Sequence, residues 1–189
     1  MNPLGRRAGG GFLALLGQLL LLTLISASPG RAAPPQVPFG DAVTAALTNY
    51  NRTTPSIATG GLLKEGALEE LKDLGFTAIV DLRSPEEGIA EEQAGAKKLG
   101  LKYFNIPVGA KTPTKDQVAA FTAIVEDESN LPMMVHCVSA NRAGAMWSLY
   151  RVAMGVPHEI AIEEGRTVGL KPRRENAVRA VLGMPPIAE

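Results

Sequence analysis

The chain has 189 residues, enough for one domain, and its 19 basic residues balance its 19 acidic ones. This balance gives no basic excess for binding nucleic acid, and aromatic residues at 5% argue against a base-stacking surface. The single cysteine excludes a disulfide within the chain, and with only two histidines present a Cys/His zinc site is not expected. We expect no cofactor.

Residues 1–33 have the layout of a secretory signal peptide, with cleavage expected between residues 28 and 33. Arg6 and Arg7 precede an apolar run of 14 residues, 12–25, and small residues follow it. The run is shorter than the roughly 20 residues of a membrane-spanning helix. We therefore expect export to the periplasm or the extracellular space, with no stable membrane insertion after cleavage. An uncleaved anchor is the alternative.

Residues 34–55 are rich in Pro, Ala, Asn and Thr and are predicted to be a linker. A domain is predicted over 56–183, followed by a tail over 184–189. Strands are expected over 57–59, 76–82, 101–107 and 132–136, and helices over 64–74, 85–99, 114–127, 142–154, 158–167 and 173–182.

Ser84 and Thr114 each begin a capping box, in which a Glu or Gln stands three residues later. Strands that alternate with helices predict an α/β fold, with a mainly parallel sheet of four to five strands flanked by helices. In such sheets ligands bind beyond the carboxyl ends of the strands.

The only cysteine, Cys137, directly follows the apolar strand at 132–136 and precedes the helix at 142–154. This order places loop N–H groups at a helix N-terminus, which binds anions. A cysteine there should ionise more readily than a free thiol. It could also be an ordinary core residue, but core packing does not require His136 before it or Arg142 after it. We interpret the stretch as a reactive thiolate in an anion-binding loop.

The His-Cys pair, the tight loop and the Arg at the head of a helix resemble the signature of the cysteine-dependent phosphatases. The resemblance is closer to the phosphatase-like domain of the beta-lactamase-hydrolase-like proteins, which are described as protein-tyrosine-phosphatase-like or as sulfur transferases. It runs from about residue 57 to 182. Its segments are Ile57-Ala58-Thr59-Gly60-Gly61, Val80-Asp81-Leu82-Arg83, Asn105-Ile106-Pro107-Val108, the cysteine loop, and Glu164-Gly165-Arg166-Thr167-Val168-Gly169-Leu170.

The resemblance implies a cysteine-phosphatase-like fold in which Cys137 forms a covalent intermediate and Arg142 binds an oxyanion. Thiolate attack and a planar guanidinium fork suit these two roles. Backbone N–H groups of the loop can point inward as an anion nest. The expected substrate-binding residues are His136, Val138, Ser139, Ala140, Asn141 and Ala143.

Three departures from the phosphatase pattern are present. Four residues separate Cys137 from Arg142 where phosphatases have five, and Ala143 stands where they have Ser or Thr. The stretch 108–113 also lacks the carboxylate that serves as general acid, a group typically worth about 10²–10⁴-fold in rate. Asp81 is a candidate replacement acid, or else it hydrogen-bonds to the loop.

These departures favour sulfur transfer through a persulfide on Cys137. The alternatives are phosphomonoester hydrolysis, as in protein tyrosine phosphatases, and a non-catalytic module that binds anions or peptides. The expected partner is a small anionic or sulfane-sulfur substrate, and the oligomeric state stays open. Arg83 is expected to pair with Glu86 or Glu87. A basic cluster near the C-terminus is either a solvated face or a rim that attracts an anionic substrate; it contains Arg166, Lys171, Arg173 and Arg174.

Overall fold

The computed structural model describes residues 36–187. The signal peptide predicted over 1–33 lies outside the described residues, as do the last two residues of the predicted tail. Within 36–187, no helix combines the length and the apolarity needed to cross a membrane.

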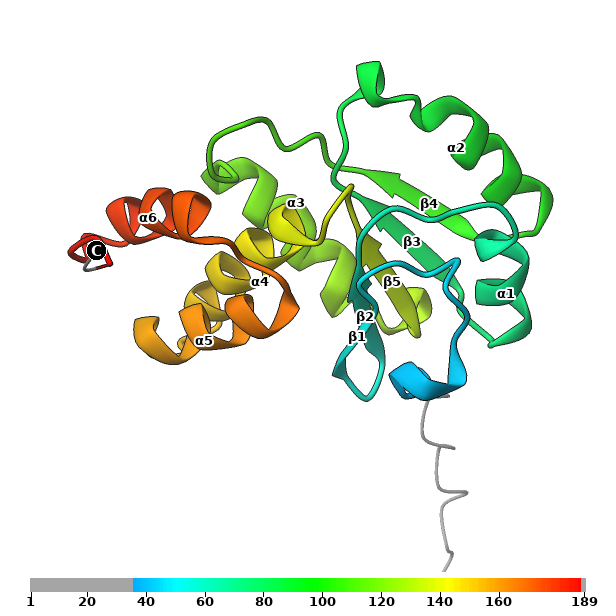
Figure 1. The fold of residues 1–189 in the computed structure, drawn as a ribbon, viewed down its shortest axis with the longest axis horizontal. Coiled ribbons are helices and arrows are strands. Elements are labelled where there is room, and N and C mark those ends of the chain that lie inside the picture. Colours follow the sequence, from blue (N-terminus) through cyan, green and yellow to red (C-terminus); the bar gives the residue numbers. More distant parts are fainter. Residues whose placement is uncertain (1–35, 188–189) are drawn as a thin grey trace, which may run out of the picture. The chain divides into compact units, whose positions relative to one another are not determined.

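A five-stranded sheet forms the centre of the domain (Figure 1). Its strands lie in the order β1-β2-β5-β3-β4, and only β1 runs antiparallel to its neighbour. Their bounds are Asn51–Thr54 (β1), Ile57–Gly60 (β2), Ala78–Asp81 (β3), Lys102–Asn105 (β4) and Met133–His136 (β5). The predicted α/β fold with a mainly parallel sheet is confirmed.

The middle strand, β5, is fully buried and pairs with β2 on one side and β3 on the other. Successive side chains of a strand point to opposite faces. Accordingly, Met133 and Val135 pack with Phe121 in one hydrophobic cluster, while Met134 packs with Leu71 in another. Burial on both faces explains why this strand is an uninterrupted apolar run in the sequence.

Helices cover both faces of the sheet (Figure 1). Residues of α3 and α4 contribute to the first cluster, and residues of α1 and α2 to the second. The remaining helices, α5 and α6, pack on α4 through a third cluster around Leu149 and Ile162. The bounds are Ala67–Asp73 (α1), Ile89–Lys98 (α2), Lys115–Glu126 (α3), Asn141–Ala153 (α4), His158–Val168 (α5) and Pro172–Val181 (α6).

The linker predicted over 34–55 is wrong for its described part. That part contains β1, and its side chains Val37 and Leu47 are 2% and 3% exposed in the cluster around Leu71. The prediction failed because the strand is short, polar and half-buried, so it lacks the alternation of apolar and polar residues that marks a strand.

Both predicted capping boxes are present, but they cap different structures. Thr114 accepts from the Gln117 amide at the start of α3, as expected. Ser84 instead caps one 3₁₀ turn, Pro85–Glu87, because Gly88 then adopts a left-handed conformation (φ 80°) and α2 starts only at residue 89. The break leaves Glu87 as the last residue of this turn, from which its side chain reaches Arg142.

Phe121 is fully buried and meets the ring of Tyr150 edge-on at 5.5 Å between centroids. We expect Phe121→Ala to lower the free energy of unfolding by about 3–5 kcal/mol, because it removes an aromatic contact and leaves a cavity. Urea denaturation would measure this. The matched control is Phe39→Ala, since Phe39 is 65% exposed and its ring lies under the Arg52 guanidinium; we expect a loss of about 1 kcal/mol or less. Equal losses would contradict the assigned core.

Candidate active site

Cys137 lies where β5 ends, and the loop after it turns directly into α4. The Val138 carbonyl accepts from the Leu62 amide at 3.1 Å, which ties the loop to the segment after β2. Ala140 takes a left-handed conformation (φ 61°), uncommon for a residue other than glycine, and its carbonyl accepts from the Gly144 amide at 2.8 Å. This sharp turn brings the N-terminus of α4 next to the cysteine, as the sequence predicted.

Asn141, the first residue of α4, braces a distant segment rather than the loop itself. Its Oδ1 accepts from the Lys171 amide at 2.9 Å, just before α6. The nearby Gly169 approaches so closely that a Cβ on it would lie 2.9 Å from the Cβ of Ala140. These contacts hold the start of α6 against the cysteine loop.

Arg142 is held by a two-point ion pair with Glu87. Its Nη1 and Nη2 donate to Oε2 and Oε1 of Glu87, both at 2.6 Å, and Nη1 also donates to the Val108 carbonyl at 3.2 Å. The Arg142 guanidinium lowers the pKa of Glu87 to about 2. In turn Glu87, and to a smaller extent Cys137, raises the pKa of Arg142 against the effect of burial. Arg142 is therefore a fixed positive charge that interacts with Cys137.

The sequence did not identify Glu87 as a site residue. Its only visible signal was local, since it is the third residue after Ser84 in the capping box, and the Ser84 amide does donate to Glu87 Oε2 at 2.8 Å. The contact with Arg142 spans 55 residues, which no local pattern indicates.

A pocket of about 360 Å³ opens beside Arg142. It is lined by Ser84, Glu87, Val108, Gly109, Ala110, Ser139, Asn141, Arg142 and Arg174. Cys137 itself is 1% exposed, and both Arg142 and Arg174 interact electrostatically with it. The site thus combines one thiol, two guanidinium groups and one carboxylate, which suits an anionic ligand. Of the loop residues predicted from the sequence, Ser139 and Asn141 line the pocket, while Ala143 is buried in the first cluster.

Asp81, the candidate replacement acid, does not line this pocket. It is fully buried and accepts hydrogen bonds from the backbone and guanidinium of Arg83 and, at 2.6 Å, from the Tyr103 hydroxyl. Burial alone would raise its pKa, but these bonds outweigh it and lower the pKa of Asp81 below its usual value. A carboxylate held ionised in this way is a poor proton donor, so the assignment of Asp81 as the acid is wrong.

Arg83 pairs with Asp81 and Glu92, each at 2.7 Å, rather than with Glu86 or Glu87. His136 joins this buried network, with its Nε2 2.9 Å from Oε1 of Glu92. Ligand atoms of Asp81, Glu92 and His136 lie within 4.8 Å of one another, close enough to share a metal ion. However, Arg83 already engages both carboxylates, and its fixed charge opposes a cation there. We interpret the network as an anchor for the residue that precedes Cys137.

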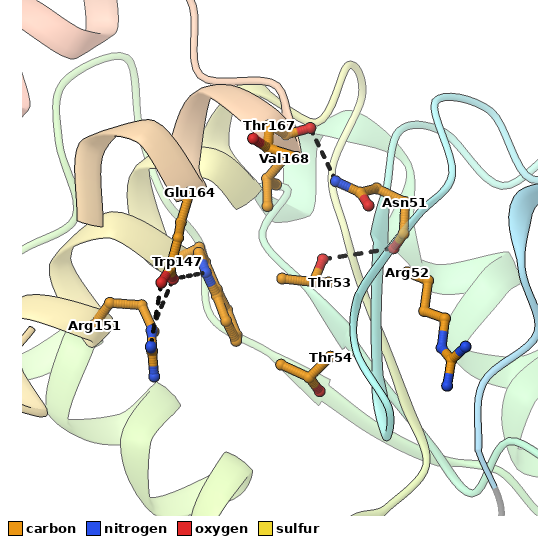
Figure 2. A pocket seen from close by; sticks show the side chains of 9 residues that line it. All are labelled: Asn51, Arg52, Thr53, Thr54, Trp147, Arg151, Glu164, Thr167 and Val168. Carbon is orange, nitrogen blue, oxygen red and sulfur yellow. Dashed lines mark hydrogen bonds and ion pairs between the residues drawn. The ribbon is translucent and has the colours of Figure 1, made fainter. Parts of the chain in front are cut away.

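A second pocket, of about 280 Å³, lies between β1 and the helices α4 and α5 (Figure 2). Its Glu164 accepts from Trp147 Nε1 at 2.9 Å and from Arg151 Nε at 2.7 Å, and Asn51 donates to the Thr167 carbonyl. Because these polar groups satisfy one another, and because Arg142 and Arg174, which interact with Cys137, line the other pocket, the pocket beside Arg142 is the better candidate.

Comparison with known protein families identifies the family of this chain. The family described as "DSP-PTPase phosphatase fused to NAD+ Kinase" matches residues 42–179. The chain belongs to this family. This places it in the protein-tyrosine-phosphatase superfamily and confirms the resemblance seen in the sequence. No curated protein sequence matches the chain.

Solved structures similar to this family member come from at least three organisms, and two of the three described here are called phosphatases. A putative phosphatase (DUF442) from Shewanella putrefaciens is 23% identical, with a TM-score of 0.60, and the match covers 72% of this chain and 93% of that one. The catalytic core of the PP-IP phosphatase Siw14 from S. cerevisiae is 17% identical, with a TM-score of 0.61 and coverage of 72% and 87%. A Cys-to-Ser variant of TpbA from P. aeruginosa, bound to pTyr, is 19% identical, with a TM-score of 0.59 and coverage of 79% and 91%. These matches confirm the cysteine-phosphatase-like fold.

The Glu87–Arg142 pair predicts a pH dependence of stability. The pKa of Glu87 is about 2 in the folded protein against an ordinary value of 4.5, so ionised Glu87 stabilises the fold above about pH 4.5. That contribution falls as the pH drops from about 4.5 towards 2. We expect the difference in unfolding free energy between wild type and Glu87→Gln to be constant from pH 7 to 5 and to shrink below pH 4.5, as measured by urea denaturation.

Glu65→Gln serves as the control, because it removes one carboxylate from an exposed position. Its difference from wild type should not follow that of Glu87→Gln. A Glu87→Gln difference that is the same at pH 3 and pH 7 would contradict the assigned ion pair.

Proposed function

We propose that the chain is a cysteine-dependent phosphatase that hydrolyses phosphate monoesters. The observation that carries this proposal is that Cys137, buried at the end of β5, interacts with the guanidinium groups of Arg142 and Arg174, which line a pocket beside the N-terminus of α4. Membership of a DSP-PTPase family supports the same chemistry. The similar TpbA variant is bound to pTyr, an aryl phosphate, and this class of compound is therefore the first substrate to test.

In the proposed reaction the Cys137 thiolate attacks phosphorus and the bond to the leaving oxygen breaks. The product is a phosphocysteine, which water then hydrolyses to release phosphate and restore the thiolate. Arg142 and the first N–H groups of α4, which have no acceptor within the helix, stabilise the charge on the phosphoryl oxygens. Because Glu87 and the Val108 carbonyl already orient Arg142, binding a phosphate requires little reorganisation of this side chain.

The leaving group presents the main chemical constraint. Among the residues that line the pocket, Glu87 is the carboxylate, and with a pKa of about 2 it is ionised at neutral pH. A group in this state does not donate a proton, and a missing general acid typically costs about 10²–10⁴-fold in rate. The site is therefore best matched to substrates whose leaving group departs without a proton, such as aryl phosphates.

Sulfur transfer is the second candidate function. Three observations favour it: the loop between Cys137 and Arg142 has four residues, Ala143 replaces a hydroxyl residue, and the residues that line the pocket include no protonated acid. Sequence reasoning placed this function first, whereas family membership favours the phosphatase. A module that only binds anions is a third candidate, and export through residues 1–33 remains part of the proposal.

Incubating the full chain with an aryl phosphate, and separately with thiosulfate and cyanide, tests the ranking. We expect phosphate release and no thiocyanate. Cys137→Ser should lower phosphate release at least about 10³-fold, because the covalent intermediate cannot form, while phosphate binding persists.

Each of the other outcomes has a defined meaning. Thiocyanate without phosphate would reverse the order of the two enzymatic functions. Phosphate binding without turnover of either substrate would support the binding module. Phosphate release that persists in Cys137→Ser would remove Cys137 from its proposed role.

A further inference from the structure

Arg174, in the first turn of α6, reaches the pocket from a part of the chain far from the cysteine loop. It lines the pocket together with Arg142. Its Nη1 donates to the Gly109 carbonyl at 3.2 Å and to the Lys111 carbonyl. Arg142 binds the Val108 carbonyl of the same loop. Both guanidinium groups therefore bind carbonyls of the same loop and line the same pocket.

No acidic side chain within the described residues neutralises the charge of Arg174. Within residues 36–187 no carboxylate lies in ion-pair contact with Arg174. By contrast, Arg166 of α5 and Arg179 of α6 both pair with Glu175. The Nε of Arg174 is buried and has no hydrogen-bond partner among these residues. Burial and the nearby positive charge of Arg142 lower the pKa of Arg174. A buried donor without an acceptor is costly, so an anion that reached it would be stabilised.

The charges in the pocket divide into two parts. Glu87 balances the charge of Arg142 through their two-point pair. No carboxylate of the pocket pairs with Arg174, although both Arg174 and Arg142 interact electrostatically with Cys137. A phosphoryl group at the cysteine loop would use Arg142 and the helix N-terminus, which leaves the guanidinium of Arg174 for a different group of the ligand.

We propose that Arg174 is a specificity-determining residue that selects substrates carrying a second anionic group next to the scissile phosphate. The proposal rests on the proposed phosphatase function and narrows its substrate class. The competing interpretation is that Arg174 is purely structural and only holds the carbonyls of Gly109 and Lys111. The two differ in one measurable respect: a structural residue affects all ligands alike, whereas a specificity residue affects only the doubly anionic ones.

The experiment compares the binding of inorganic phosphate and of pyrophosphate to the full chain carrying Cys137→Ser, by calorimetry. Adding Arg174→Gln should weaken pyrophosphate binding about tenfold or more, because a charge-assisted hydrogen bond is lost, and should change phosphate binding by less than about threefold. Arg174→Lys keeps the charge but not the planar fork, so it should recover part of the affinity for pyrophosphate.

Arg173→Gln is the matched control, since Arg173 is the exposed neighbour on the same helix and does not line the pocket. It removes the same charge and should leave the affinities for both ligands unchanged. If Arg174→Gln does not fold, as judged by its thermal transition, the test rests on the comparison of Arg174→Lys, in the Cys137→Ser protein, with Cys137→Ser alone.

Equal loss of phosphate and pyrophosphate binding in Arg174→Gln would overturn the inference and assign Arg174 a structural role. The inference would also be overturned if Arg173→Gln and Arg174→Gln weakened pyrophosphate binding equally. That result would indicate a long-range effect of positive charge and no direct contact with Arg174. A different result would reject the proposed function itself. In that case Cys137→Ser with Arg174 intact would bind neither inorganic phosphate nor pyrophosphate, and wild type would not hydrolyse aryl phosphate.

Discussion

The position of β5 between two parallel neighbours is the constraint on which the site depends. Met133 and Val135 must face one core and Met134 the other, and a shift of one residue would turn all three to the wrong faces. The register that satisfies this packing sets His136 level with Gly60 of β2 and Asp81 of β3. Cys137 then follows at the carboxyl edge of the sheet, where α4 begins. The placement of Cys137 is thus a consequence of burying apolar side chains, and it needs no separate source of stability.

Arg142 joins parts of the chain that the sheet alone does not bring together. Its guanidinium contacts Glu87 in the turn after β3 and the Val108 carbonyl after β4, while its backbone belongs to α4. The capping box contributes to this arrangement, because the Ser84 amide holds the same Glu87 oxygen that Arg142 Nη1 contacts. Ordering a long side chain costs conformational entropy. Here the cost is met in folding, so the guanidinium is already in place when an anion enters.

The sequence predicted those features that depend on local patterns. Apolar runs and capping signals identified β2, β3, β4, β5 and the helices, and the spacing around Cys137 identified the loop. Features that depend on long-range pairing were missed: Glu87 was visible only as a cap, Asp81 could not be separated from a possible acid, and Arg174 could not be separated from a solvated face. The strand β1 was missed for a different reason. Its residues are polar, and its position is set by pairing with β2 rather than by an apolar pattern.

The lack of a proton donor and the unpaired positive charge at the pocket both affect how the proposed site stabilises the leaving group. When the bond to the leaving oxygen breaks, negative charge develops there and must be met by a proton or by a cation. Glu87 is ionised and committed to Arg142, so it supplies no proton. Arg174 carries a charge that no carboxylate in residues 36–187 balances, and it contacts the loop after β4, which lacks the carboxylate expected from the resemblance to phosphatases. A substrate of the class that we propose would place its second anionic group against Arg174, which selects the substrate but supplies no proton to the departing oxygen.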